Sequence, residues 1–172
     1  INLTALTTNA ATLINRSWHA TFFQEHAVAL TGHGKWQGLF REQDIEIHMG
    51  PPDPEHGKLS AGVGAGSRKP HKLIPQPILS QTFREAYALG RVAAYCLEAD
   101  LTQVVFYVVY GWTGGHLLLI AAQRSDGIME AIAEEIAMHS QGSIDRPTCI
   151  LGDMNCEPEY MPTLFGLITE EG

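Results

Sequence analysis

The most informative segment of the chain reads Thr148-Cys149-Ile150-Leu151-Gly152-Asp153-Met154-Asn155-Cys156-Glu157-Pro158. Its apolar first half predicts a buried strand that ends in a carboxylate and a carboxamide, separated by one residue. Residues two apart on an extended backbone share a face, so we expect Asp153 and Asn155 to point at the same ligand. Gly152 removes a side chain that would crowd this approach. The pair suits phosphodiester chemistry, although an Asx turn is the commonest use of such residues after a strand.

Composition indicates one folded domain. The chain has 172 residues, of which 45% are hydrophobic and 17% charged, enough for a core and too little charge for disorder. No apolar run approaches the ~20 residues that a membrane helix needs. The first residues, Ile1 to Thr4, lack an initiator Met and the basic region of a signal peptide. We therefore expect a single domain over residues 1–172, without a membrane segment, cut from a longer protein.

Charge and cysteine content narrow the function classes. Eleven Lys and Arg against nineteen Asp and Glu give a net charge of -8, which argues against a dedicated electrostatic binder of nucleic acid. A nuclease is still compatible, because a catalytic site neutralises phosphate locally with a divalent metal ion and a few cations. Cys96, Cys149 and Cys156 show no CxxC spacing, so a disulfide framework is not expected. A reducing, intracellular location, the nucleus included, is favoured.

Hydrophobic patterns predict alternating strands and helices. Strands are expected over residues 1–6, 19–25, 59–66, 90–97, 103–110 and 148–151. Helices are expected over residues 10–16, capped by Thr8 and Asn9, and from Glu157-Pro158 through Phe165. The segment 103–110 is almost continuously apolar, which places it at the centre of a sheet with both faces covered.

One longer helix is expected to lie on that sheet. Ser125 and Asp126 are suitable caps for its start. Its apolar stripe and its acidic side are formed by Ile128, Ile132 and Ile136, and by Glu130, Glu134 and Glu135, respectively.

Three polar residues share one position in the predicted elements. Glu25, Tyr110 and Asp153 each end a strand, and open α/β sheets bind ligands where strand ends converge. Mg²⁺ prefers oxygen ligands and usually takes only one or two protein carboxylates. Glu25 is therefore a candidate metal ligand, and Asp153 a candidate to orient or deprotonate an attacking water.

On these residues the chain resembles the endonuclease/exonuclease/phosphatase superfamily, which includes deoxyribonuclease I, apurinic endonucleases and retrotransposon endonucleases. The matching motifs occur in the order of that superfamily: Asn2, Gln24-Glu25, Ala61-Gly62-Val63-Gly64, Gly90-Arg91, Tyr110 and Gly152-Asp153-Met154-Asn155. The resemblance implies an α/β fold, the four-layered α/β sandwich of deoxyribonuclease I. It also implies hydrolysis of phosphodiesters with Mg²⁺, or Mn²⁺ in its place. DNA is the favoured substrate, and the endonuclease of a mobile element is the favoured parent protein.

The resemblance assigns roles to individual residues. Glu25 would ligate Mg²⁺, Asp153 would activate water, and phosphate oxygens would accept hydrogen bonds from Asn2, Tyr110 and Asn155. Four further residues are candidates for contact with the substrate: Arg91, Trp112, Arg68 and Lys69. Trp112 would stack on a base or sugar, and the basic loop with Arg68 and Lys69 would rest on a nucleic-acid backbone. The alternatives are ordinary packing for Trp112 and a solvated surface for the loop with Arg68 and Lys69.

The chain also departs from the superfamily. Its members close their sites with a C-terminal Asp-His pair, and neither residue type follows Asn155 here. The resemblance therefore implies a domain truncated at the C-terminus, close to inactive alone. Because half a sandwich leaves an apolar sheet face uncovered, we expect self-association. Two other functions stay open: a phosphatase of small phosphorylated lipids or sugars, and a folded remnant that binds metal without turnover.

Overall fold

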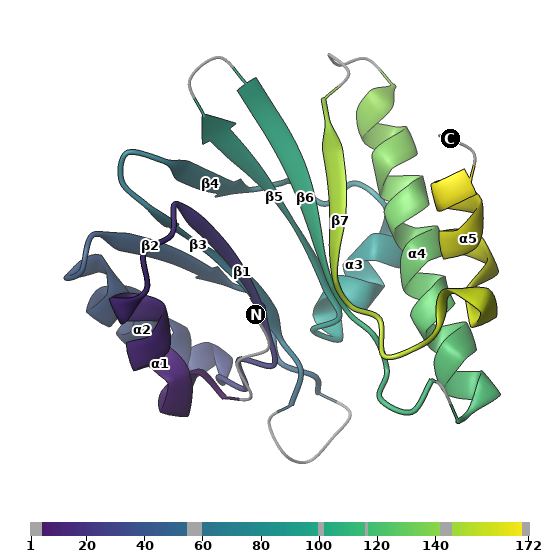
Figure 1. Cartoon of the computed structure of the whole chain (residues 1–172), viewed down its shortest axis with the longest axis horizontal. Helices are drawn as coiled ribbons and strands as arrows, with labels where there is room; N and C mark the ends of the chain where they lie inside the picture. The colour runs from purple at the N-terminus through teal and green to yellow at the C-terminus, as the bar shows by residue number, and fades with distance from the viewer. Residues whose placement is uncertain (1–4, 55–59, 100–101, 116, 142–145, 170–172) are drawn as a thin grey trace.

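Two β-sheets packed face to face form the centre of the molecule, and helices cover the outer face of each (Figure 1). The computed structural model describes residues 5–54, 60–99, 102–115, 117–141 and 146–169. The four-layered α/β sandwich expected from the sequence is confirmed. None of the described helices has the length and hydropathy needed to cross a bilayer.

The first sheet has the strand order β1-β3-β2, with both pairs antiparallel. It is built with its helices from α1 (Leu6–Asn15), β1 (Ala20–Gln24), the 3₁₀ helix η1 (Leu30–Gly32), α2 (His33–Arg41), β2 (Ile45–Met49) and β3 (Val63–Arg68). Apolar side chains of both helices pack against one face of this sheet, through Leu6, Leu13, Phe23, Phe40, Ile45 and Ile47.

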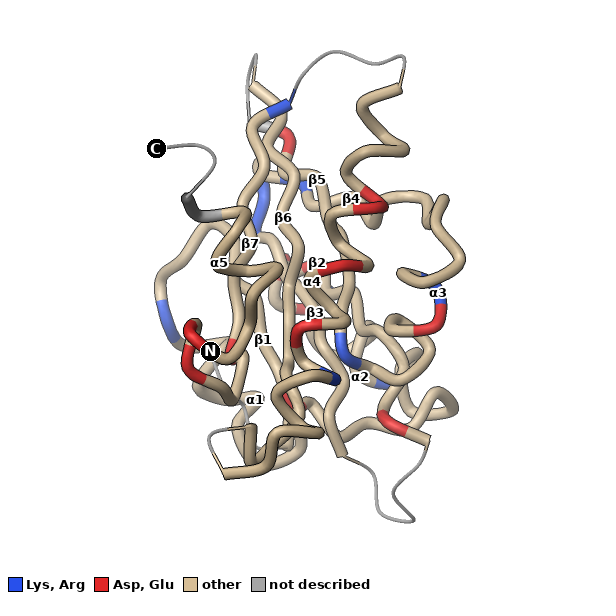
Figure 2. Tube along the Cα trace, turned by 90° about the vertical axis from the view of Figure 1, so that its right-hand side faces the viewer, with Lys and Arg blue, Asp and Glu red and all other residues tan. Residues whose placement is uncertain are grey.

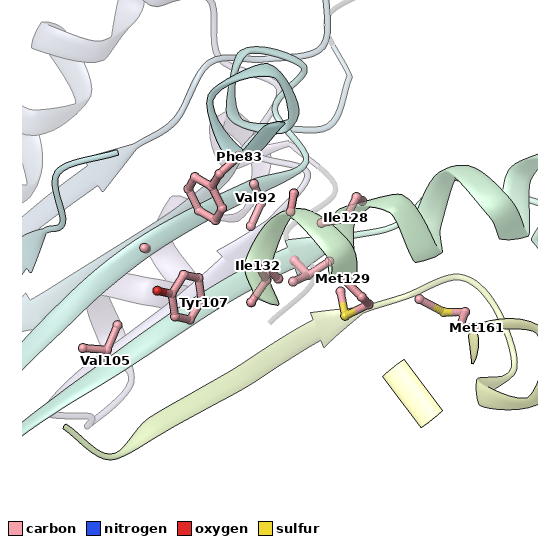
Figure 3. Packing of buried hydrophobic residues seen from close by; sticks show 11 residues of the cluster. Phe83, Val92, Val105, Tyr107, Ile128, Met129, Ile132 and Met161 are labelled. Atoms are coloured by element: carbon pink, nitrogen blue, oxygen red, sulfur yellow. The ribbon is translucent and has the colours of Figure 1, made fainter. Parts of the chain in front are cut away.

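The second sheet has the order β4-β5-β6-β7, in which β6 and β7 are parallel and the other pairs antiparallel. Its elements are β4 (Lys72–Pro75), α3 (Gln81–Ala88), β5 (Val92–Ala99), β6 (Thr102–Tyr110), α4 (Leu119–Ser140), β7 (Thr148–Asp153), the 3₁₀ helix η2 (Pro158–Tyr160) and α5 (Pro162–Thr169). Figure 3 shows the core between this sheet and α4, where Ile128, Met129 and Ile132 of the helix pack with Val92, Tyr107 and Met161. The Tyr107 ring meets Phe83 of α3 edge-on, with ring centroids 5.8 Å apart.

The two sheets bury each other's inner faces. Small and apolar side chains meet there, from β3 (Val63, Ala65), β4 (Leu73), β5 (Ala93, Tyr95) and β6 (Val108, Tyr110). Only residues 69–71 separate β3 from β4, so the chain crosses from one sheet to the other at a short turn. The expectation of a half-sandwich with an uncovered apolar sheet face is therefore wrong, and with it the reason to expect self-association.

Several element boundaries differ from the sequence patterns. The expected first strand lies mostly outside the described residues, but its last residue, Leu6, already begins α1, and the expected caps Thr8 and Asn9 lie inside that helix. Ser125 and Asp126 likewise lie inside α4, which begins at Leu119. Their side chains cap other segments: Ser125 Oγ accepts from Trp112 N at 2.9 Å, and Asp126 Oδ1 accepts from Thr163 N at 3.0 Å. A capping side chain can thus serve a neighbour in space, which sequence spacing does not reveal.

The strand of the central motif is not buried. β7 lies at the edge of the second sheet within the described residues, and all six of its residues are exposed or half-buried. Its apolar character led to the wrong prediction, because Ile150 and Leu151 pack on their neighbours without being covered. β6, by contrast, lies between β5 and β7, which confirms its predicted central place.

Glu135 was expected on the solvent side of its helix and is instead completely buried. Its carboxylate accepts hydrogen bonds from Leu79 N at 2.9 Å and Ser80 N at 2.6 Å, just before α3 begins. Burial, followed by the nearby charge of Glu135, raises the pKa of Tyr107 to about 12. A carboxylate at the start of a helix satisfies otherwise unpaired N–H groups, so Glu135 fixes α3 against α4.

Replacing Glu135 by Gln should lower the free energy of unfolding by about 2 kcal/mol, because the amide removes the charge and one of two acceptors from buried N–H groups. Urea unfolding followed by circular dichroism measures the change. Glu130→Gln, on the exposed side of the same helix, should stay within about 0.5 kcal/mol of the unsubstituted protein. Equal effects of the two substitutions would contradict this role of Glu135.

Candidate functional site

The parallel pairing of β6 and β7 brings two of the predicted site residues side by side. Tyr110 and Asp153 are register partners at the ends of these strands, and Gly111 N donates to Asp153 O at 2.8 Å just beyond them. The register also sets Gly152 against Val109. Gly152 has a φ of 156°, and a Cβ there would lie 2.0 Å from Val109 O. Only glycine allows β7 to approach β6 this closely.

Glu25 joins this group from the other sheet. Gln24, the last residue of β1, donates from Nε2 to Val109 O at 3.0 Å and so ties β1 to β6. Glu25 follows with a φ of 56°, a conformation that costs of order 1 kcal/mol or more for a residue other than glycine. The Tyr110 hydroxyl donates a hydrogen bond to Glu25 Oε1. Burial and then this acceptor raise the pKa of Tyr110, so its hydroxyl stays protonated and available as a donor.

Asp153 and Asn155 form the Asx turn that was considered as an alternative. Asn155 N donates to Asp153 Oδ1 at 2.9 Å, and Asn155 has a φ of 52°, which asparagine tolerates better than most residues. Asn155 Nδ2 also donates to Gly111 O at 3.0 Å, next to Tyr110. A shallow depression is lined by Gly152, Asp153, Met154, Asn155, Cys156 and Glu157. The turn therefore fixes the side chains beside an open surface.

Arg91 lies beneath this group. It is 4% exposed and forms an ion pair with Asp53, which is 3% exposed. Its Nη1 donates to Gly111 O at 3.3 Å, and its guanidinium lies 5.3 Å from the Tyr110 ring centre. Because Asp53 belongs to the loop after β2, this one arginine connects that loop to β6 and to the turn that follows it.

Trp112 stands next to the strand ends on the α4 side. Two guanidinium groups lie over its indole, those of Arg91 and Arg124, each 4.5 Å from the ring centre. The backbone around it packs tightly: a Cβ on Gly111 would lie 1.9 Å from Met154 O, and one on Gly115 2.6 Å from Asn155 O. The turn 111–115 is therefore pressed against the segment that carries Asp153 and Asn155.

His26, adjacent to Glu25, is completely buried. Its Nδ1 accepts from Val28 N at 3.1 Å, and its Nε2 lies 3.0 Å from Gly50 O, so the neutral ring with the proton on Nε2 satisfies both contacts. Burial lowers the pKa of His26 to about 4, against a smaller opposite effect of the Gly50 carbonyl. The ring thus holds the segment after Glu25 to the loop after β2, and protonation would remove the acceptor that Val28 N uses.

The structure brings together most of the predicted site residues. Contacts link Glu25, Tyr110, Asp153, Asn155, Arg91 and Trp112. Asn2 lies outside the described residues. Arg68 and Lys69 do not join the group, because antiparallel pairing of β1 with β3 places them at the opposite end of the first sheet from Glu25. Arg68 donates to carbonyls at the end of α1, and Lys69 pairs with Asp44 at 2.9 Å.

Sequence reasoning missed several residues that shape the site: Gln24 as a link between sheets, His26, Asp53 and Arg124. Asp53 lies in a Pro-rich loop and gave no signal by itself, since its partner is 38 positions away. Arg124 follows Trp112 by twelve positions, and only a helix beginning at Leu119 instead of after Asp126 would have placed it near the indole. In the described residues no group of three or more His, Cys, Asp and Glu side chains is arranged to hold a metal ion.

Solved structures with similar folds include nucleases and phosphatases. An AP endonuclease from Archaeoglobus fulgidus superimposes with a TM-score of 0.66 at 13% identity, over 96% of this chain and 68% of that one. NExo from Neisseria, described as a 3' phosphatase bound to a product DNA hairpin, gives 0.62 at 15% identity, over 96% and 68%. NExo from Neisseria meningitidis, described as a 3'-5' exonuclease, gives 0.58 at 16% identity, over 90% and 56%.

These structures belong to the endonuclease/exonuclease/phosphatase superfamily, as was expected from the motifs. No protein-family model matches the sequence, and no curated protein matches it significantly. The chain spans 56% to 68% of the three structures described above. At identities of this order the likeness establishes the fold, which is that of deoxyribonuclease I.

Gly152→Ala should lower the free energy of unfolding by at least about 2 kcal/mol, because the new methyl group collides with the backbone of Val109. Gly127→Ala is the matched control: it lies inside α4, where a Cβ would meet nothing within 4 Å. That substitution should stabilise by ~0.5 to 1 kcal/mol. Urea unfolding measures both, and a neutral Gly152→Ala would contradict the close approach of β7 to β6.

The buried neutral His26 should make stability depend on pH. Its pKa is about 4 in the folded protein and 6.5 in the unfolded chain, so the unfolded chain binds the proton more strongly. The stabilisation is complete above pH 6.5 and is lost as pH falls toward 4, by about 3 kcal/mol in all. Urea unfolding at several pH values should show a smaller slope in this window for His26→Gln. An unchanged slope would show that another group causes it.

Proposed function

We propose that this chain carries the metal-ligating and water-activating side of a site for Mg²⁺-dependent hydrolysis of phosphodiesters, with DNA as the substrate. The observation that carries the proposal is the convergence of Glu25, Tyr110, Asp153 and Asn155 at the ends of three strands from two sheets. Figure 1 shows the ends of β1, β6 and β7 at the same end of the molecule. The fold is one shared by nucleases and phosphatases.

The donor set fits Mg²⁺ better than a transition metal. Mg²⁺ needs one or two protein carboxylates and completes its shell with waters and substrate phosphate, so a three-ligand protein cluster is not required. Glu25 is the ligand in this proposal; a carboxylate has about four acceptor positions, so the bond from Tyr110 is compatible with ligation. When bound, Mg²⁺ would neutralise charge on a phosphate oxygen and polarise the phosphorus toward attack. Mn²⁺ accepts the same oxygen ligands and is the natural substitute.

The other residues act on water and on phosphate. The Asp153 carboxylate orients the attacking water and takes its proton, while the bond from Asn155 N to Oδ1 fixes the carboxylate. Asn155 and Tyr110 supply N–H and O–H donors for phosphate oxygens as negative charge builds up. For Tyr110, rotation of the hydroxyl transfers its hydrogen bond from Glu25 to phosphate. Asn2, of the same motif set, is assigned a phosphate contact by resemblance alone.

DNA is the favoured substrate because two of the similar structures are described as an AP endonuclease and as NExo bound to a DNA hairpin. A mobile-element endonuclease acting in the nucleus is the proposed source of the chain on the motif resemblance alone. A phosphatase of small phosphorylated molecules is the second candidate, since one similar structure is described as a 2',3'-cyclic phosphatase in complex with adenosine-2',3'-vanadate. The Asp-His pair of the superfamily does not follow Asn155, so we expect slow turnover by these 172 residues.

The test is nicking of supercoiled plasmid under single-turnover conditions, with protein in excess and Mg²⁺ varied. We expect slow, Mg²⁺-dependent nicking that Asp153→Asn reduces roughly hundredfold, because a general base typically contributes that much. Glu25→Gln should raise the Mg²⁺ concentration needed for half-maximal rate about tenfold. Direct Mn²⁺ titration by electron paramagnetic resonance should show the same loss of affinity.

Asp44→Asn is the control, since this exposed carboxylate pairs with Lys69 away from the strand ends. It should leave rate and metal affinity unchanged. Release of inorganic phosphate from phosphorylated lipids or sugars, with plasmid untouched, would replace the endonuclease by the phosphatase. Mn²⁺ binding lost in Glu25→Gln, without cleavage of any phosphoester, would leave only a metal-binding remnant.

A further inference from the structure

The two arginines that lie over Trp112 differ in exposure. Arg91 is buried together with Asp53, with which it forms an ion pair. Arg124 projects from α4 and is exposed, with its guanidinium 4.5 Å from the indole centre. Arg91 was a candidate for substrate contact on sequence grounds, but a side chain 4% exposed does not reach a substrate. Its position makes it a support for Trp112 and Tyr110.

The turn of α4 that carries Arg124 is connected to the candidate site through two successive contacts. The next residue, Ser125, accepts the backbone hydrogen bond of Trp112 at 2.9 Å, which ties this turn of α4 to the end of β6. The turn 111–115 in turn packs directly on Met154 and Asn155. These contacts connect the turn of α4 that carries Arg124 to the segment that carries Asp153 and Asn155.

A nucleic-acid strand that binds beside Asp153 needs a cation on the protein surface there. The chain has a net charge of -8, and Figure 2 shows the described Lys and Arg residues scattered among acidic residues instead of gathered in one stripe. Glu25, Asp153 and Glu157 add negative charge at the site itself. A polyanion approaching these carboxylates depends on local cations. A guanidinium stacked on an indole loses less side-chain entropy on binding and can hold two phosphate oxygens at once.

We propose that Arg124, ordered by Trp112, binds the phosphate backbone of a nucleic-acid strand beside the bond that is cleaved. The proposal rests on the proposed function, because it names the side of that site on which the strand continues. The contact is with non-bridging oxygens, so it contributes affinity without sequence preference. The strand then runs from Asp153 across the indole edge toward the first turns of α4.

The test measures binding without cleavage. A fluorescein-labelled DNA duplex is titrated with the 172-residue chain in Ca²⁺ buffer, by fluorescence anisotropy, from 50 to 200 mM salt. Arg124→Ala should weaken binding about tenfold and reduce the slope of log K against log salt by about 1, as expected for loss of one phosphate contact. Arg124→Lys should keep the slope and lose less affinity. The melting temperature should change by no more than ~4 °C, because the stacking of an exposed guanidinium on an indole is weak.

Arg41→Ala is the matched control: an exposed arginine at the end of α2, near the start of β2 and thus opposite to Glu25 in the first sheet. It should change neither affinity nor slope. Equal slopes for Arg124→Ala and the unsubstituted chain, or no salt-dependent binding by that chain, would overturn the proposal. Arg124-dependent binding without Asp153-dependent nicking would support this inference while the proposed function failed. Asp153-dependent nicking that Arg124→Ala leaves unchanged would support the proposed function and overturn this inference.

Discussion

The parallel pairing of β6 with β7 is the constraint on which the candidate site depends. Parallel strands end at the same edge of a sheet, so the pairing of Val109 with Gly152 also sets Tyr110 beside Asp153. The first sheet is attached at the same point, because Gln24 donates to the carbonyl of Val109. One backbone position thus organises three strand ends. A bulkier residue at position 152 would separate them.

Two residues at these strand ends adopt backbone conformations that cost stability but fix the geometry of the site. Glu25 and Asn155 both adopt left-handed φ values, which are persistent only where surrounding contacts over-determine them. The buried ion pair of Arg91 and Asp53 likewise fixes geometry more than it adds stability. Removing two charges from water costs about as much as their attraction returns, so such a pair is weak evidence for stability. Its effect is positional, since Arg91 also donates to the Gly111 carbonyl that accepts from Asn155.

The sequence predicted the elements whose signals are local and continuous. The apolar run of β6, the motif around Asp153 and the strand before Glu25 were recognised, and with them the four-layered sandwich. β2, β4, α2 and α3 were not predicted, because they are short and their ends depend on partners far along the chain. Glu135 shows the physical reason: a helical period marked it as exposed, while its actual partners, Leu79 and Ser80, lie more than 50 positions earlier.

The same distinction applies to the site. Glu25, Tyr110, Asp153 and Asn155 follow recognisable strand ends, so convergence was predictable once the strands were placed. Arg68 and Lys69 formed the densest basic cluster in the sequence, yet antiparallel pairing carries them to the far end of the sheet. The strand register decides which residues reach the site, and the composition of a loop does not reveal that register. Arg124 illustrates the converse, since its relation to Trp112 appears only when α4 begins at Leu119.

The Asx turn at Asp153 and Asn155 does not compete with a catalytic role. The hydrogen bond from Asn155 N to Asp153 Oδ1 uses one of the acceptor positions of the carboxylate and fixes its orientation. A freely rotating carboxylate would have to lose that freedom when it orients water, and the turn removes the cost in advance. What distinguishes this turn from an ordinary one is the long-range contact of Asn155 with Gly111, 44 positions away. The local motif is thereby held against the end of a second strand.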